Sequence, residues 1–92
     1  MSVTVYVLEG LATAKRYVGI AGDLQARLRE HRARRTKGAQ VVGDFRLIYT
    51  ESHETYPAAR AREKFLKNGR GRAWLFTVVP RTRPARGAGK PV

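Results

Sequence analysis

The first twenty residues constrain the fold most, because they contain two strand-like segments separated by a short run of small residues. In residues 3–9, β-branched side chains recur at alternate positions, and this period of two is typical of a half-buried strand. Residues 16–20 (RYVGI) form a second such segment, and residues 10–15 between them are short enough for a hairpin. We therefore expect an antiparallel hairpin in which Tyr6 and Tyr17 face each other across the two strands.

A helix and a third strand are predicted after the hairpin. Asp23 can accept hydrogen bonds from the free N–H groups of a helix start, and the apolar stripe behind it indicates a helix over residues 23–35. Residues 36–44 are polar and contain glycine, which predicts a loop. Residues 45–49 (FRLIY) regain strand character, and residues 51–54 are expected to be a polar connection.

A second helix is predicted over residues 56–68. Pro57 suits the first turn of a helix, and the pair Asn68 and Gly69 predicts an end with a left-handed cap. Residues 72–79 form a short apolar run that fits either a helix or a last strand, and periodicity leaves both alternatives open.

These elements follow the order β-β-α-β-α, which favours a small α/β (α+β) fold with a mostly antiparallel sheet and helices packed on it. A length of 92 residues fits one domain. We assign residues 1–79 to this domain. Residues 80–92 are basic and rich in proline and glycine, so we expect a disordered tail that can touch phosphates non-specifically.

The charge balance indicates the kind of partner. The chain has 19 Lys and Arg against 7 Asp and Glu, a net charge of +12, so a polyanion, and first of all a nucleic acid, is expected. The absence of cysteine excludes disulfides and cysteine-based zinc sites and fits a reducing cytosol. No apolar run is long enough to span a bilayer and no signal-peptide pattern is present, so we expect a soluble, unprocessed, cytoplasmic protein without membrane contact.

Two polar residues border the apolar stripe of the first predicted helix. With 3.6 residues per turn, Arg27 and His31 lie next to the stripe formed by Leu24 and Leu28, both on the same side of it. Taken singly, Arg27 fits a snorkelling side chain and His31 fits a surface imidazole. Their position together, close to Tyr17, favours a functional site.

The carboxylates are few and scattered. None of the 7 belongs to a close acidic cluster of the kind that two-metal nucleases use, so a two-metal mechanism is not expected. Glu63 lies near the edge of the apolar face of the second predicted helix, with Lys67 one turn later. An ordinary Glu63–Lys67 surface ion pair is therefore the alternative to a functional role for Glu63.

Five features stand in a characteristic order along the chain: VYV (5–7), YVG (17–19), Arg27, His31 and Glu63 within AREKFLKNG. In this order and spacing, over about residues 3–75, the chain resembles the GIY-YIG nuclease family, especially its short single-domain bacterial members. The first motif departs from the family pattern, because Thr4-Val5-Tyr6 stands in place of Gly-Ile-Tyr. The tyrosine itself is kept.

The resemblance implies a three-stranded antiparallel sheet with flanking helices and a metal-dependent endonuclease that hydrolyses DNA phosphodiester bonds, with a role in DNA repair or processing. It also implies one catalytic site around a single divalent cation, formed by Tyr6, Tyr17, Arg27, His31 and Glu63. Glu63 would hold the ion, Mg²⁺ or Mn²⁺. One of the two tyrosines would take the proton of the attacking water, and the sequence does not decide between Tyr6 and Tyr17. The metal or Arg27 would favour the phenolate form of that tyrosine. His31 would relay that proton or orient a tyrosine, and Arg27 would hold phosphoryl oxygens.

No base-reading element is identifiable, so we expect recognition through shape and phosphates. Candidate nucleic-acid contacts are Arg32, Arg34, Arg35, Lys67, Asn68, Arg70 and Arg72, and for each cation the alternative is a solvated side chain. Branched, flapped or single-stranded DNA, and also RNA, remain open as substrates. The alternative function is a non-catalytic, basic nucleic-acid-binding module with a nuclease-like fold. A structural or ribosome-associated basic protein is a third possibility.

Overall fold

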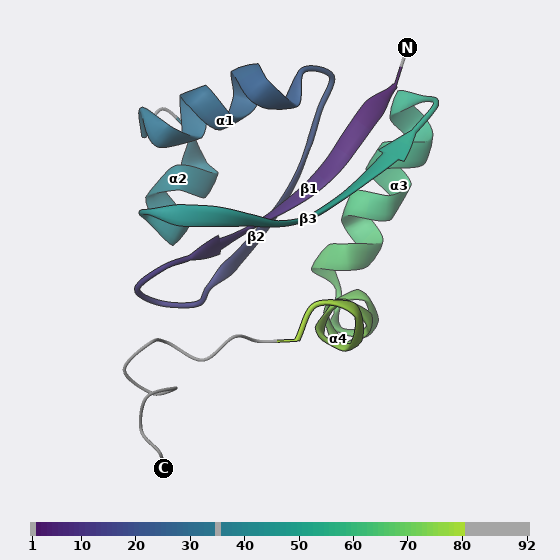
Figure 1. The fold of residues 1–92 in the computed structure, drawn as a ribbon. Coiled ribbons are helices and arrows are strands. Elements are labelled where there is room, and N and C mark those ends of the chain that lie inside the picture. The colour runs from purple at the N-terminus through teal and green to yellow at the C-terminus, as the bar shows by residue number, and fades with distance from the viewer. Residues whose placement is uncertain (1, 35, 81–92) are drawn as a thin grey trace.

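The fold is a three-stranded antiparallel sheet with helices on both faces (Figure 1). The structure, a computed structural model, describes residues 2–34 and 36–80. Its elements are β1 (Val3–Gly10), β2 (Arg16–Ala21), α1 (Leu24–Arg32), α2 (Lys37–Val42), β3 (Phe45–His53), α3 (Tyr56–Lys67) and α4 (Gly69–Val78). The predicted α+β fold class is confirmed. Arg35 and residues 81–92, which make up almost all of the predicted tail, lie outside the described residues.

The central strand β1 gives the sheet two different faces, because its side chains alternate between them. Val5 and Val7 pack in one buried cluster with residues of α3 and α4. Tyr6 and Leu8 pack in the other with residues of α1 and α2. Figure 1 shows the two helix pairs on opposite sides of the sheet. The strand order β2-β1-β3 leaves β2 at an edge, where side chains from both helix layers can meet.

The register of the hairpin differs from the prediction. Tyr6 lies opposite Gly19, and Leu8 lies opposite Tyr17, so the two tyrosines are diagonal neighbours on one face and do not face each other directly. The connection between Gly10 and Arg16 sets this register. Gly19 is needed opposite Tyr6, because a Cβ there would lie 2.5 Å from the Tyr6 hydroxyl oxygen.

Two predicted boundaries around residue 36 were wrong. α1 ends at Arg32 and not at residue 35, since Arg34 has a positive φ of 61° that a helix cannot continue. The predicted loop over residues 36–44 contains α2, which begins because the Thr36 side chain accepts a hydrogen bond from the Ala39 N–H. Gly43, with a φ of 65°, ends it.

The polar connection predicted at residues 51–54 was also wrong for most of its length. β3 runs on to His53, and its last residues pair with the start of β1, with Val3 opposite His53. Polar side chains are tolerated there because β3 is an edge strand.

The junction between α3 and α4 is tighter than predicted. Asn68 is extended (φ −90°, ψ 174°), so the predicted left-handed cap was wrong. Asn68 ends α3 and also begins α4, because its side chain accepts a hydrogen bond from the Gly71 N–H at 2.9 Å. The run over residues 72–79 is resolved as helix, and the element order becomes β-β-α-α-β-α-α. In residues 2–34 and 36–80, no helix is both long and apolar enough to cross a membrane.

Candidate active site

Two tyrosines and a histidine meet at the β2 edge of the sheet, on the face covered by α1 and α2. The Tyr6 hydroxyl, from β1, and His31 Nε2, from α1, are hydrogen-bonded at 2.7 Å. The His31 ring also meets the ring of Tyr17, from β2, edge-on, with 5.6 Å between centroids. His31 is only 1% exposed, so the alternative of a surface imidazole is wrong.

A second hydrogen bond fixes the orientation of His31. Its Nδ1 contacts the Thr36 hydroxyl, which also caps α2. Burial and the nearby Arg27 guanidinium lower the pKa of His31, so its neutral form is favoured. A neutral imidazole has one donor and one acceptor nitrogen, and here each nitrogen has a hydroxyl partner. The ring is thus held in place at both ends.

The environment of Tyr6 keeps its hydroxyl protonated. Burial, and then the neighbouring Tyr17, raise the pKa of Tyr6, and Arg27 only partly opposes this. The expectation that Arg27 would favour a phenolate is therefore outweighed at Tyr6. Tyr6 is 2% exposed, whereas Tyr17 is only partly buried. Of the two tyrosines, Tyr17 is the more accessible to water.

The opposite helix layer brings Glu63 to the same edge. α3 contacts β2, and Glu63 on α3 is buried, with 5% of the residue exposed. Its carboxylate is close enough to Tyr6 to contribute to the raised pKa of that tyrosine. The predicted ion pair with Lys67 is present, with Lys67 Nζ 3.1 Å from Glu63 Oε2. It is not an ordinary surface pair, because the carboxylate is buried and Arg60 Nη1 lies 2.7 Å from its other oxygen.

Lys67 connects the two halves of the site. Its ammonium lies over the Tyr17 ring, 5.6 Å from the centroid, while it pairs with Glu63. We call Tyr6, Tyr17, His31, Glu63 and Lys67 the edge cluster. The sequence prediction placed Lys67 among the nucleic-acid contacts and did not identify its position within the site, nor the contact of Thr36 with His31. A lysine one turn after a candidate glutamate was the available signal for Lys67.

Arg27 lies at the rim of the edge cluster. Its side chain is 42% exposed and pairs with Glu30 at 3.2 Å, while its charge still affects the pKa values of Tyr6 and His31. A half-exposed guanidinium with an exposed partner can turn towards an incoming phosphate at little cost.

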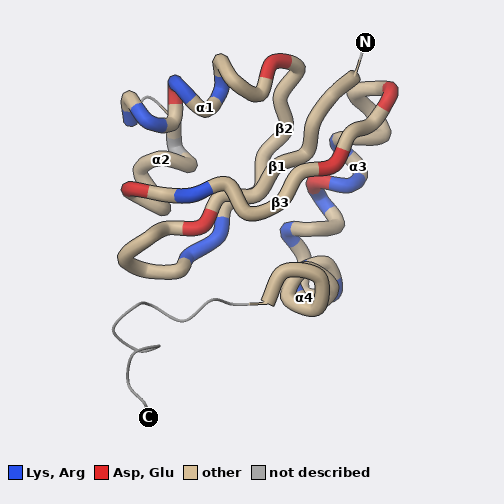
Figure 2. The backbone as a smooth tube through the Cα atoms, in the orientation of Figure 1, with Lys and Arg blue, Asp and Glu red and all other residues tan. Residues whose placement is uncertain are grey.

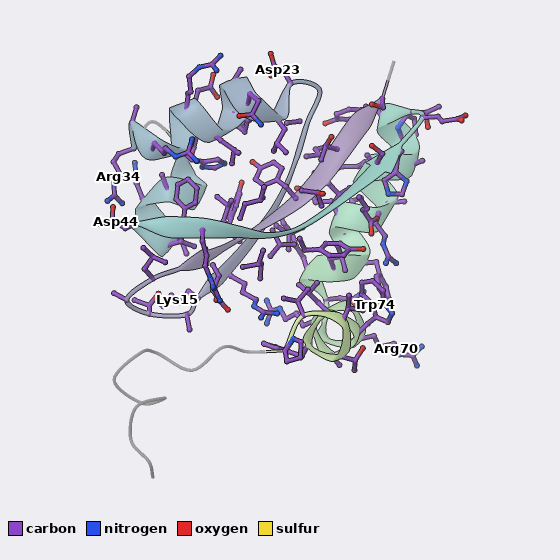
Figure 3. The ribbon with its side chains drawn as sticks, in the orientation of Figure 1. Lys15, Asp23, Arg34, Asp44, Arg70 and Trp74 are labelled. Carbon is purple, nitrogen blue, oxygen red and sulfur yellow. The ribbon has the colours of Figure 1, made fainter. Side chains whose placement is uncertain are left out.

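The remaining candidate nucleic-acid contacts do not form one surface. Figure 2 shows basic residues along α1 on one side of the sheet and along α3 and α4 on the other. Arg34 pairs with Asp44 at one end of the molecule, whereas Arg70 is exposed on α4 far from them (Figure 3).

The other candidate contacts have different surroundings. Arg32 lies over the Phe45 ring, and the Asn68 side chain already caps α4. Arg72 is exposed on α4 and, with Lys67, lines a cavity beside the edge cluster.

The edge cluster contains a single carboxylate, and this limits how it could hold a metal ion. Among the described residues, no group of three or more His, Asp or Glu is arranged to bind one. Mg²⁺ is commonly bound by one or two carboxylates together with waters and substrate phosphates. Glu63 fits such a site, since its partners Arg60 and Lys67 are long, half-exposed side chains that can move away. The donor set therefore suits an ion that a phosphate helps to bind.

The fold and this constellation define a class of protein. The family model described as "GIY-YIG catalytic domain" matches residues 2–75, and the chain belongs to the GIY-YIG family. Within it, the chain is similar to a UPF0213 protein of Streptococcus sanguinis (strain SK36), with 36% identity over 83 residues, 87% of this chain and 92% of the relative. The solution NMR structure of a UPF0213 protein from Bacillus halodurans has the same fold, with a TM-score of 0.55 and 24% identity over 99% of this chain and 97% of that chain.

Proposed function

We propose that the protein is an endonuclease that hydrolyses DNA phosphodiester bonds at the edge cluster with one divalent cation, Mg²⁺ or Mn²⁺, and that it acts in DNA repair or processing. The observation that supports this most strongly is the position of Lys67, which contacts both the Tyr17 ring and the Glu63 carboxylate. Through this contact, polar groups from opposite helix layers form one continuous cluster in a basic protein.

The residues divide the chemical work as follows. Tyr17, the more accessible tyrosine, first gives its hydroxyl proton to solvent. As the phenolate, it takes the proton of the attacking water while that water bonds to phosphorus and the P–O bond to the leaving 3′ or 5′ oxygen breaks. Tyr6 and His31, hydrogen-bonded to each other and buried, hold the Tyr17 ring in place. Arg27 binds phosphoryl oxygens as negative charge develops on them.

Glu63 would hold the cation. When bound, the ion neutralises phosphate charge and stabilises the leaving 3′ or 5′ oxygen. Arg60 and Lys67, the present partners of the carboxylate, are then free to pair with phosphates of the same strand.

The test is a cleavage assay on labelled duplex, flapped, branched and single-stranded DNA with Mg²⁺ or Mn²⁺. Glu63→Gln should reduce cleavage by about a hundredfold or more while DNA binding in EDTA is retained. Glu54→Gln, which changes an exposed glutamate outside the edge cluster, is the matched control and should cleave like the wild type. Cleavage by Glu63→Gln at the wild-type rate would overturn the assignment.

A second candidate is a binding module that performs no chemistry. It is favoured by the ion pairs of Glu63, because both carboxylate oxygens already have cationic partners within the protein. This function predicts salt-sensitive nucleic-acid binding and no metal-dependent cleavage of any of the four DNA forms.

A further inference from the structure

A cavity of about 590 Å³ opens beside the edge cluster and shares Tyr17 and Lys67 with it. Its other walls come from the turn between β1 and β2, from α2 and from α4. Pockets that bind small molecules have volumes of roughly 300–1,000 Å³. The cavity is therefore large enough for a nucleotide-sized group, at a position next to the proposed reaction.

The lining of the cavity combines an apolar floor with a cationic rim. Core residues such as Leu66 and Leu75 contribute to the floor, and Lys15, Lys67 and Arg72 contribute positive charge. Figure 3 shows Lys15 at the turn between β1 and β2. None of the described residues that line the cavity is acidic. Such a lining suits a flat, weakly polar group with phosphates on either side.

Arg16 adds a fixed hydrogen-bond donor to the wall. Its side chain is only 10% exposed, and it is held by Glu9 at 3.2 Å and by the Val79 carbonyl oxygen at 2.9 Å. Phe76 packs 4.4 Å from the guanidinium carbon. Among the described residues, Nη1 of Arg16 is buried without a hydrogen-bond partner. A buried, unpaired donor is unfavourable, so an acceptor on a ligand in the cavity would relieve it.

From these observations we propose that the cavity holds the base of one unpaired nucleotide of a bound DNA strand. The inference rests on the proposed nuclease function and adds the substrate class, namely DNA with at least one unpaired nucleotide beside the cleaved bond. The base lies on the apolar floor near Phe76 and accepts a hydrogen bond from Arg16, while Lys15 and Arg72 pair with the flanking phosphates. A paired base would first have to leave the stack, so unpaired nucleotides bind at lower cost.

The test measures binding in EDTA, where cleavage is absent. Three fluorescein-labelled DNA probes are compared by anisotropy: a perfect duplex, the same duplex with one bulged nucleotide, and that bulge with an abasic residue. The bulged probe should bind at least about fivefold more tightly than the other two, because stacking of a base on protein side chains contributes about that factor or more. The abasic probe keeps the phosphates and removes only the base.

Two variants that each add one negative charge distinguish the contribution of the cavity to DNA binding from that of the overall charge of the protein. Val41 lines the cavity and is 52% exposed on α2, whereas Val78, 46% exposed on α4, is not among the lining residues. Val41→Glu should abolish the preference for the bulged base, and Val78→Glu should keep it. Both exchanges are at exposed positions, and thermal melting checks that each variant is folded.

The inference fails if the wild type binds the bulged and abasic probes equally, if it binds none of the probes, or if folded Val41→Glu keeps the preference. The same proteins are then assayed with Mg²⁺ and Mn²⁺. A base preference without cleavage supports the cavity and overturns the nuclease function, whereas cleavage without a base preference does the reverse.

Discussion

Two clusters in this protein use the same kinds of side chain in different ways. The edge cluster joins tyrosines, a histidine, a glutamate and a lysine. The second, which we call the β3 cluster, consists of Tyr49, Glu51, His53 and Arg62. Its first three members occupy alternate positions of one strand and so share one face by local geometry, whereas the edge cluster draws on two strands and two helices from opposite layers.

The hydrogen bonds of the two clusters differ more than their composition. In the β3 cluster, Tyr49, His53 and Arg62 all converge on Glu51, at 2.6, 2.7 and 2.8 Å. Burial alone would raise the pKa of Glu51, but these three hydrogen bonds outweigh it and lower that pKa. The carboxylate is fully paired, which is typical of a stabilising network.

In the edge cluster the polar groups do not all bind one carboxylate. Tyr6 and His31 are hydrogen-bonded to each other in their neutral forms, and the partners of Glu63 among the described residues are two half-exposed cations. Because Arg60 and Lys67 are half-exposed, these two cations can turn from Glu63 towards another anion, whereas Tyr6 and His31 are fixed. The comparison teaches that the types of residue do not distinguish the two clusters, whereas the exposure of the cations that pair with each glutamate does.

The largest expected difference is in cleavage after loss of a tyrosine hydroxyl. Tyr17→Phe should lower the single-turnover rate by about a hundredfold or more, since a general base contributes at least that factor. Tyr49→Phe, the matched change in the β3 cluster, should leave the rate within about twofold. Rates are measured at saturating protein with Mg²⁺.

Tyr6→Phe serves as the discriminating control in that series. If it slows cleavage more than Tyr17→Phe does, the proton acceptor is Tyr6 and the assignment by exposure is wrong. Equal rates for all three variants and the wild type would remove the functional difference between the clusters.

Loss of a glutamate charge should lower the stability of the protein more in the β3 cluster than in the edge cluster, the reverse of the order expected for cleavage. Glu51→Gln leaves Arg62 and its other partners without an anion, and should lower the free energy of unfolding by about 2 kcal/mol. Glu63→Gln should cost less than about 1 kcal/mol, because Arg60 and Lys67 are half-exposed and water replaces the lost pairing. Urea denaturation measures both, and an equal or larger loss for Glu63→Gln would contradict this ranking.

Acidification should affect the clusters in separate pH ranges. The pKa of His31 is lowered from 6.5 on folding, so the unfolded chain binds a proton that the folded chain does not. Stability from His31 is complete above about pH 6.5 and is lost as the pH falls through the folded-state pKa, by at most about 1.4 kcal/mol per pH unit. The lowered pKa of Glu51 acts in the same direction, but only below about pH 4.5.

Urea midpoints between pH 7.5 and pH 3.5 resolve the two steps. His31→Gln should remove the step that begins near pH 6.5, and Glu51→Gln should reduce the one below pH 4.5. If the urea midpoint of the wild type does not change between pH 7 and pH 5, protonation of His31 is not coupled to unfolding, and the prediction is wrong.

The sequence predicted the fold well wherever the pattern is local. Alternation in β1 and the Asp23 cap identified the hairpin and the start of α1, since both depend on neighbouring residues. α2 was missed because it is only six residues long and depends on the Thr36 cap. The end of β3 was missed because its polar residues are held by pairing with β1, which no local pattern reveals.

For the candidate site, the sequence identified residues but not their contacts. The motif order pointed to Tyr6, Tyr17, His31 and Glu63, which the structure brings to one sheet edge. The burial of His31, the diagonal tyrosines and the bridging role of Lys67 depend on register and on the approach of α3 across β2. These are long-range properties, so a sequence pattern alone could not supply them.

The smallest expected effect concerns the ion pair at the rim of the edge cluster. Arg27 and Glu30 are 42% and 50% exposed, so Glu30→Gln should change the free energy of unfolding by less than about 0.5 kcal/mol. Arg62→Gln breaks a more buried pair, with exposures of 28% and 17%, and should cost more. Glu30→Gln also releases Arg27 for phosphate, so cleavage should stay at the wild-type rate or rise by no more than a few fold. A large loss of stability or cleavage in Glu30→Gln, measured by urea denaturation and single-turnover assay, would mean that Arg27 is fixed by Glu30 and that the rim of the edge cluster is as closed as the β3 cluster.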